Sequence, residues 1–228
     1  SWNADIWGSP GAHPARLNHY VNNDRDVWLL ALGRQGPFPG ESLTLRDNGS
    51  LWLSGDGTLG SGVVVLDGGQ VQGRVSGSAL VEGRIRVDSD SKLLLVDGSL
   101  ELATEFSGNA NLSASAFRSS ASLTISGQDA GFSGAFLLGG SAADNVILEV
   151  RFTGSFPKAG LRMPAAAAGR LPVLVLDGET AFASVELPRK GGGQVRLDPG
   201  DYDARDLKRA GVVPAALKDL GGRLRVLK

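Results

Sequence analysis

Short apolar runs return along the chain at a fixed interval. Residues 43–45, 64–66 and 85–87 each alternate so that two apolar side chains share one face, as in a half-buried strand. The interval from Leu45 to Leu66 is 21 residues, and the interval from Leu66 to Val87 is also 21 residues. A polar turn and a second short run follow each of them; the turns are 46–50, 67–70 and 88–91, and the second runs are 51–53, 71–73 and 93–95. The pattern predicts two strands and one turn in about every 20 residues.

A repeat of this kind is typical of a parallel β-helix. Each coil has an apolar inner face that it cannot bury alone, and stacking the coils about 4.8 Å apart buries that face and pairs the backbone. Glycines in the turns, at positions 49, 68 and 69, allow the positive φ angles of tight corners. We therefore expect an all-β fold, a right-handed parallel β-helix. A β-sandwich of short strands is the alternative, which the 21-residue repeat disfavours.

The repeat is less regular after Val87. The run 99–102 ends 15 residues after Val87, and the run 122–125 ends 23 residues after Leu102. Further runs typical of strands follow at 132–138, 145–152, 171–176 and 182–187. We expect the coils to span residues 41–187, with a looser register in their second half.

The two ends of the expected single domain, 1–228, differ from the repeat. Residues 1–40 hold three of the four tryptophans and both histidines, and we expect them to form an N-terminal cap or a flap along the coils. Residues 188–228 are expected to form a strand and a helical C-terminal cap. Asp203 is predicted to be the N-cap of that helix and Gly211 to end it, with Lys208 and Arg209 in the last turn.

Composition narrows the classes of function. The 33 glycines among 228 residues indicate many turns, and the formal net charge is −1 with no basic stripe, so nucleic acid is not an expected partner. No apolar run approaches 18 residues, so no membrane span is expected. The absence of cysteine excludes disulfides and thiolate metal sites. The chain starts without methionine or a signal peptide, and we interpret it as a processed piece of a longer protein.

Catalytic and metal-binding features are weak in this sequence. Glycoside hydrolysis needs two carboxylates about 5–9 Å apart. The closely spaced acidic pairs coincide mostly with an expected corner or a helix start, so no catalytic residue is expected; these pairs are Asp24/Asp26, Asp88/Asp90 and Asp201/Asp203. His13 and His19 stand six residues apart, which is no recognised ligand spacing. We expect no metal and no other cofactor.

Four motifs, taken in their order, carry a family resemblance. They are the opening SWNADIWGSPGAHPARLNHYV, then GESLTLRDNGSLWL, the central GQDAGFSGAF, and the closing LDPGDYDARDLKRAGV with GGRLRVL. Together they resemble the autotransporter-associated β-strand repeat type of large secreted bacterial proteins. The chain is also similar to β-helical modules joined to secreted xylanases of gut bacteria, which are classed as carbohydrate-binding modules of family 89. This resemblance implies a xylan-binding role, and no binding residue is carried over from it.

Trp52 is the first candidate for sugar binding. Its parity places it on the outer face of a strand whose Leu51 and Leu53 face inward, and its outward neighbours on the next coils are Gln72 and Leu94. An exposed indole ring can stack on the apolar face of a sugar. The alternative is that residues 1–40 cover Trp52.

Charged side chains beside the first strand of each coil form a second candidate group. Arg46, Arg86 and Asp88, with Asp67 between them, can hydrogen-bond sugar hydroxyls or the carboxylates of uronic acids. The alternative is a solvated ladder of surface ion pairs that contribute little.

We therefore expect a non-catalytic, secreted carbohydrate-binding module of a bacterium that degrades plant cell walls. It would bind xylan or a related plant β-glycan and tether an attached glycoside hydrolase in the parent chain to that polymer. The alternative is a structural β-solenoid, the spacer or adhesin stalk of a secreted bacterial protein. A β-helical lyase or hydrolase is a third hypothesis.

Overall fold

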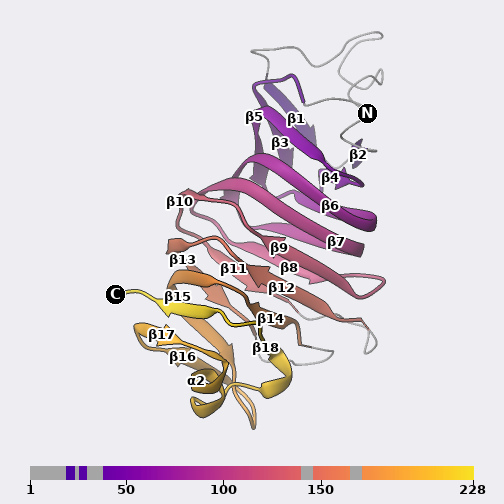
Figure 1. Ribbon diagram of the computed structural model, residues 1–228. Helices are drawn as coiled ribbons and strands as arrows, with labels where there is room; N and C mark the ends of the chain where they lie inside the picture. The colour runs from indigo at the N-terminus through magenta and orange to yellow at the C-terminus, as the bar shows by residue number, and fades with distance from the viewer. Residues whose placement is uncertain (1–18, 24–25, 30–37, 140–145, 165–170) are drawn as a thin grey trace, which may run out of the picture.

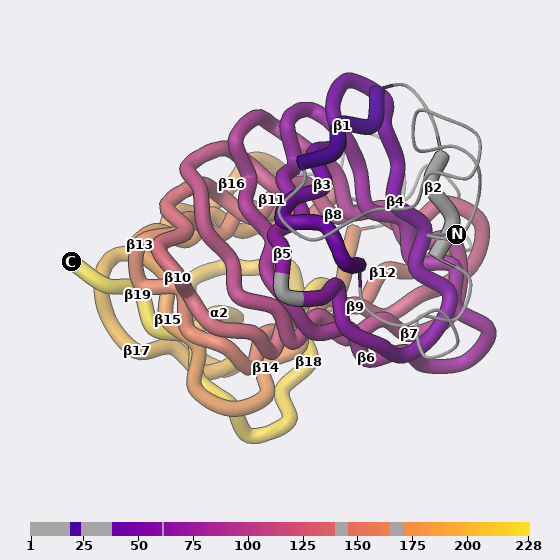
Figure 2. Tube along the Cα trace, turned by 90° about the horizontal axis from the view of Figure 1, so that it is seen from above, coloured from indigo at the N-terminus to yellow at the C-terminus, as the bar shows by residue number. Residues whose placement is uncertain are grey.

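The protein is an elongated β-solenoid of about six turns (Figure 1). A computed structural model describes residues 19–23, 26–29, 38–139, 146–164 and 171–228. Strands hold 67% of the residues and helices 5%. The coils lie one behind another when the molecule is seen along the stack (Figure 2). The predicted all-β parallel β-helix is confirmed.

Each complete coil contributes to three parallel sheets, which we call sheets I, II and III. The long strand β6 (Gln70–Ser89) passes through all three, with residues 70–73 in sheet II, 78–83 in sheet III and 84–89 in sheet I. Strand β7 (Ser91–Gly108) follows the same course one coil further on. The other strands of the coils are shorter because turns or irregular segments separate the three sheets.

The remaining strands extend these sheets above and below β6 and β7. Sheet I also contains β1 (His19–Asn23), β3 (Ser42–Arg46), the end of β5 (Gly57–Asp67), β10 (Asp129–Phe132) and β19 (Arg223–Val226). Sheet II contains β2 (Asp26–Leu29), β4 (Ser50–Leu53), β8 (Leu112–Ala116), β11 (Ala135–Leu138) and the ends of β13 (Phe156–Arg162) and β15 (Glu179–Pro188). Sheet III contains β9 (Ala121–Ile125), β12 (Leu148–Phe152), β14 (Val173–Leu176) and β18 (Leu217–Asp219).

The strand register confirms the 21-residue repeat and extends it. Leu45 lies beside Leu66, Leu66 beside Val87, and Val87 beside Gly108, which is again 21 residues later. The expected loosening after Val87 is therefore wrong at this coil. Residues 99–102 instead pair with 78–81 in sheet III, a sheet that the sequence pattern did not reveal.

The parallel pairing excludes the β-sandwich alternative. Among the strands that the structure describes, the antiparallel pairs are β15 with β16 (Gln194–Leu197) and β17 (Gly200–Tyr202) with β19, both near the C-terminus. The other strand pairs are parallel, as stacked coils require.

Alternating side chains fill the interior of the solenoid. In the first coils the buried side chains are mainly leucine and valine, such as Leu43, Leu51 and Val64. In the later coils six buried phenylalanines form one aromatic cluster; they are Phe106, Phe132, Phe136, Phe152, Phe156 and Phe182. The ring of Phe136 lies 4.9 Å from that of Phe132 and 5.1 Å from those of Phe152 and Phe156, centroid to centroid.

Strands β1 and β2 extend sheets I and II into the region assigned to the N-terminal cap. They pair in parallel with β3 and β4, so the coils begin before residue 41. The rest of the predicted cap or flap, residues 1–18, 24–25 and 30–37, lies outside the part of the chain that the structure describes.

The C-terminal end carries the predicted helix, α2 (Ala204–Arg209). The carboxylate of Asp203 accepts hydrogen bonds from the backbone N–H groups of Arg205 and Asp206, and Gly211 follows the helix with a φ of +90°. A 3₁₀ turn, Pro214–Ala216, leads into β18, which continues sheet III. No helix in the described ranges is long and apolar enough to cross a membrane.

Candidate functional site

An outward-facing pocket on sheet II, which we call the Trp52 pocket, is the leading candidate. Its volume is about 270 Å³. Its lining comes from four successive coils and consists of Trp52, Gln72, Arg74, Leu94, Val96, Phe117 and Arg118. The two aromatic rings are its largest side chains.

Strand alternation places Trp52 in this pocket. Leu51 and Leu53 are buried in the core at 0% and 1% exposure, so the intervening Trp52 points to the outer face, where it is half-buried. Trp52 is in register with Gln72, and Gln72 with Leu94, as the sequence predicted. The predicted outward row therefore exists.

Phe117 enters the pocket from the coil that contains β8. The preceding Ala116 faces the core, and the N–H of Phe117 donates to the carbonyl oxygen of Leu95 at 2.9 Å, which keeps Phe117 aligned with the ladder. Its side chain is therefore directed outward and is 58% exposed. A large apolar side chain with this exposure marks a candidate contact surface.

Val96 lines the pocket beside a register shift in β7. Gly73 pairs with Leu95, but the next residue, Arg74, pairs with Asp97, so Val96 is an extra residue in β7. The backbone N–H and the hydroxyl of Ser119 both donate to the Val96 carbonyl, at 3.3 and 3.1 Å. Such bulges redirect side chains and occur often beside functional sites.

Two arginines line the Trp52 pocket, and none of the lining residues in the described part of the chain is a carboxylate. The guanidinium carbon of Arg74 lies 5.0 Å from the centroid of the Trp52 ring, and that of Arg118 lies 5.7 Å from the centroid of the Phe117 ring. Both are within the range of a cation–π interaction. The side-chain amide of Gln72 donates to the hydroxyl of Ser50 at 3.3 Å.

The other predicted site residues lie on sheet I and do not line the Trp52 pocket. Arg46 Nε contacts Asp67 Oδ2 at 2.9 Å, and Arg86 makes a two-pronged ion pair with Asp88. The hydroxyl of Ser89 donates to Asp67 at 2.7 Å, and this bond, followed by the Arg46 contact, lowers the pKa of Asp67 below its usual value. Arg46, Arg86 and Asp88 thus form surface ion pairs, and a sugar-binding role for them stays a prediction.

Four residues of the pocket were not predicted from the sequence: Arg74, Val96, Phe117 and Arg118. A signal for two of them was present, because Phe117 and Arg118 directly follow a run of small residues, 113–116, after which a large aromatic stands out. Arg74 and Val96 share the outward parity of Gln72 and Leu94, but the expected strands ended before them, at residues 73 and 95.

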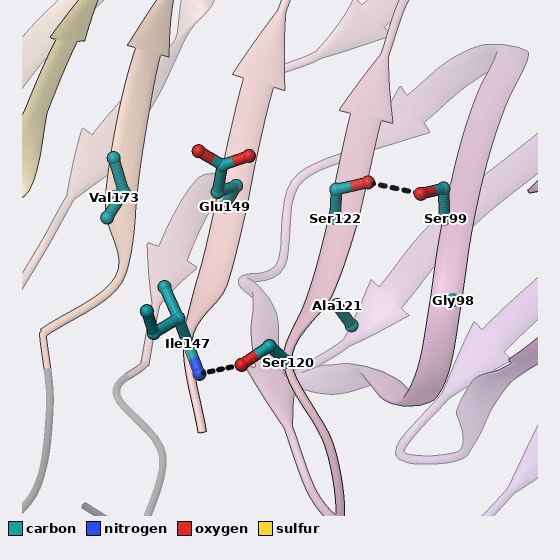
Figure 3. A pocket seen from close by; sticks show the side chains of 8 residues that line it. All are labelled: Gly98, Ser99, Ser120, Ala121, Ser122, Ile147, Glu149 and Val173. Atoms are coloured by element: carbon teal, nitrogen blue, oxygen red, sulfur yellow. Dashed lines mark hydrogen bonds between the residues drawn. The ribbon is translucent and has the colours of Figure 1, made fainter. Parts of the chain in front are cut away.

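A larger pocket of about 390 Å³ lies on sheet III (Figure 3). Its polar groups are partly paired with one another: the hydroxyl of Ser122 donates to that of Ser99 at 2.7 Å, and the N–H of Ile147 donates to the hydroxyl of Ser120 at 3.0 Å. Glu149 at its edge is paired with Lys218 at 3.1 Å. Among the residues described there, no aromatic side chain lines it, so they offer no surface on which a sugar ring stacks.

The described aspartates of the acidic pairs considered for catalysis make ion pairs, hydrogen bonds or a helix cap. Asp88 is paired with Arg86, and Asp90 accepts two hydrogen bonds from Asn111. Asp201 contacts Arg225, and Asp203 caps α2. Within the described ranges, no group of three or more histidine, cysteine, aspartate or glutamate side chains is arranged to hold a metal ion. Asp24 and His13 lie outside those ranges.

Comparison with known proteins does not assign the chain to a family. No protein-family model matches the chain, and no curated protein or solved structure matches it.

Proposed function

We propose that this protein is a non-catalytic carbohydrate-binding module whose Trp52 pocket holds a segment of an extended plant polysaccharide. The observation that carries the proposal is the half-buried Trp52 and the exposed Phe117 lining one outward pocket. Aromatic rings provide the apolar surface on which a sugar ring stacks, and the Gln72 and arginine side chains supply polar groups beside it.

The shape of the fold suits a linear polymer. The pocket spans four successive coils, and three spacings of about 4.8 Å give it a length of roughly 14 Å along the solenoid axis. Stacked β-strands also hold the lining side chains on rigid backbone, which reduces the entropy lost on binding.

Xylan or a related plant β-glycan is the proposed ligand because of the resemblance to β-helical modules of secreted xylanases. That resemblance also leads us to propose that the chain is part of a secreted bacterial protein and that it tethers an attached glycoside hydrolase to the polymer. We assign the pocket a binding role without catalysis, since no carboxylate is among its described lining residues and glycoside hydrolysis needs two.

Affinity electrophoresis in gels that contain xylan, mannan or mixed-linkage β-glucan tests the proposal. We expect xylan to retard the protein and Phe117→Ala to lose most of the retardation, because truncating an exposed ring removes stacking without opening the core. Leu220→Ala is the matched control, since Leu220 is 49% exposed but lies near the C-terminus. The absence of retardation in all three gels would refute the proposal and favour a structural stalk.

A further inference from the structure

We propose that one edge of the C-terminal cap is a second binding surface, which takes an extended polysaccharide that carries carboxylate groups. We call this surface the basic edge; it consists of Arg189, Lys190, Arg205, Lys208 and Arg209. The choice of a polysaccharide as its partner rests on the proposed function. The basic edge itself follows from the distribution of charge along the chain and from the contacts within the cap.

Positive charge is concentrated at the C-terminal end of the protein. Residues 188–228 contain ten lysines and arginines against five aspartates, a formal charge of +5, whereas residues 1–187 contain 13 against 19 acidic residues, a formal charge of −6. Helix α2 and strands β16 and β17, which belong to the positive segment, lie together at the end of the solenoid opposite β1 (Figure 1). The nearly neutral net charge of the chain therefore conceals an end that attracts anions.

Backbone contacts place the two segments of the basic edge side by side. The N–H of Lys190, in the turn between β15 and β16, donates to the carbonyl oxygen of Gly211 at 2.8 Å. The N–H of Gly211 in turn donates to the carbonyl oxygen of Lys208 at 3.1 Å. A Cβ atom built on Gly211 would lie 3.8 Å from Nε of Arg189. The cations of the turn therefore lie beside the last turn of α2.

Most cations of the basic edge are not neutralised by an ion pair. Arg209 is paired with Asp206 at 3.3 Å, and Arg205 is attracted at longer range by the capping Asp203. The exposed members that form no ion pair with a carboxylate in the described part of the chain are Arg189, Lys190, Arg205 and Lys208. Lys208 also complements the dipole of α2 from its last turn, but the helix dipole explains none of the other three.

An extended chain of uronic acid residues fits this arrangement. Lys208 and Arg209 stand three and four positions after Arg205 on one face of α2, with roughly 5–6 Å between the Cβ atoms. That spacing is close to the length of one sugar residue in an extended chain, so neighbouring cations can pair with the carboxylates of successive residues. None of the exposed large apolar side chains in the described ranges belongs to the basic edge, which favours a polar polymer over insertion into a lipid bilayer.

Titration calorimetry with a matched pair of polymers tests the proposal. The first polymer is polygalacturonate, and the second is the same polymer after its carboxyl groups have been reduced to alcohols. We expect the acidic polymer to bind about tenfold or more tightly at a salt concentration of about 0.05 M, as several exposed ion pairs allow. This advantage should shrink at about 0.5 M salt, because salt screens exposed charges.

Two double variants connect the preference to the basic edge. They are Arg189→Gln with Lys190→Gln, and Arg205→Gln with Lys208→Gln. Each should bind polygalacturonate about tenfold more weakly, the size expected for the loss of two exposed ion pairs, and should bind the reduced polymer as the wild type does. Because all four side chains are exposed, both variants should keep the circular dichroism spectrum of the wild type.

A third double variant, Lys92→Gln with Lys158→Gln, is the matched control. It removes the charge of two exposed lysines from the coils, far along the chain from the basic edge, and should keep the full preference for polygalacturonate. Neutral xylan in the electrophoresis gel should still retard all three double variants, because none of them alters the Trp52 pocket. Phe117→Ala should lose that retardation and keep the preference for polygalacturonate.

The outcomes separate the basic edge from the proposed function. Equal binding of polygalacturonate and the reduced polymer would overturn the proposal, and so would a control variant that loses as much affinity as the other two. Anionic phospholipid vesicles or duplex DNA that bind as tightly as polygalacturonate would show a general polyanion surface and overturn the assignment to a polysaccharide. Failure of xylan to retard the protein, with polygalacturonate binding intact, would overturn only the function proposed for the Trp52 pocket.

Discussion

Two phenylalanines show how position within the coil decides the role of a side chain. Phe136 lies inside the solenoid at 1% exposure, with five aromatic rings around it, whereas Phe117 lies outside at 58% exposure. The chemical groups are identical, so their contributions to stability and to binding differ because of burial alone. The two positions therefore form a matched pair for mutation.

Phe136→Ala should lower the free energy of unfolding by about 3–5 kcal/mol, because it removes buried apolar surface and leaves a cavity at the centre of the aromatic cluster. Phe117→Ala should change it by less than about 0.5 kcal/mol, as is usual for exposed positions. Urea denaturation followed by circular dichroism measures both values. Equal losses for the two variants would contradict the placement of Phe117 on the outer face.

At the residue scale, parity was sufficient to find Trp52 but not its surroundings. Alternation correctly placed Trp52 on the outer face with Gln72 and Leu94 on the next coils. Arg74 and Val96 lie two residues beyond Gln72 and Leu94 on the same face, but the predicted strands ended at residues 73 and 95 and so did not include them. Arg46, Arg86 and Asp88 were correctly placed on the exterior beside the first strand of each coil, which belongs to sheet I and not to the sheet of Trp52.

At the element scale, helix α2 is the feature with the most local signals, and its boundaries followed from them. The N-cap Asp203 and the basic Lys208 and Arg209 in the last turn occupy the predicted positions, and the acidic Asp206 lies in the first turn. A side-chain cap satisfies backbone donors without any contact from distant segments. Local sequence was therefore enough to define this element.

The cap of α2 should make a pH-dependent contribution to stability. Hydrogen bonds from the backbone N–H groups, chiefly that of Asp206, lower the pKa of Asp203 below its ordinary value of 3.8. A carboxyl group whose pKa is lowered by folding stabilises the folded state above its unfolded pKa, and this stabilisation is lost as the pH falls through the folded pKa.

Asp203→Ala should therefore destabilise the protein at pH 7, and the difference from the wild type should shrink below pH 3.8. Thermal unfolding of both proteins between pH 7 and pH 2.5 measures that difference. Asp203→Asn is the control, since asparagine also caps helices and does not titrate. A difference that is the same at pH 7 and pH 2.5 would show that the ionised carboxylate is not the stabilising species.

The strands of the coils were predicted less completely than the helix. The 21-residue repeat identified sheets I and II, because Leu45, Leu66 and Val87 occupy equivalent positions in successive coils. It failed at the next coil because Gly108 stands at the position that leucine or valine occupies before it. Sheet III remained hidden because several of its strands continue directly into those of sheet I, as in β6, without a polar turn to mark the border.

At the scale of the whole molecule, stability should vary along the solenoid axis. Each coil contacts its neighbours above and below, so a solenoid is held together by the sum of its coils and the interfaces between them. Strand β9 pairs with β7 on one side and β12 on the other, and it lies in the part of the chain that is joined by the phenylalanine cluster. Among the described strands, β1 pairs with β3 alone and β2 with β4 alone.

Hydrogen exchange measured by mass spectrometry should therefore show the slowest backbone amides in β7, β9 and β12 and faster ones in β1 and β2. Opening an outer coil breaks one interface, whereas opening a central coil breaks two and exposes buried aromatic surface. Phe136→Ala provides the internal check, because it should speed exchange most in the central strands and least in β1. Exchange in β1 that is as slow as in β9 would mean that the solenoid opens as one cooperative unit. The number of neighbouring coils would then not determine the local stability of a strand.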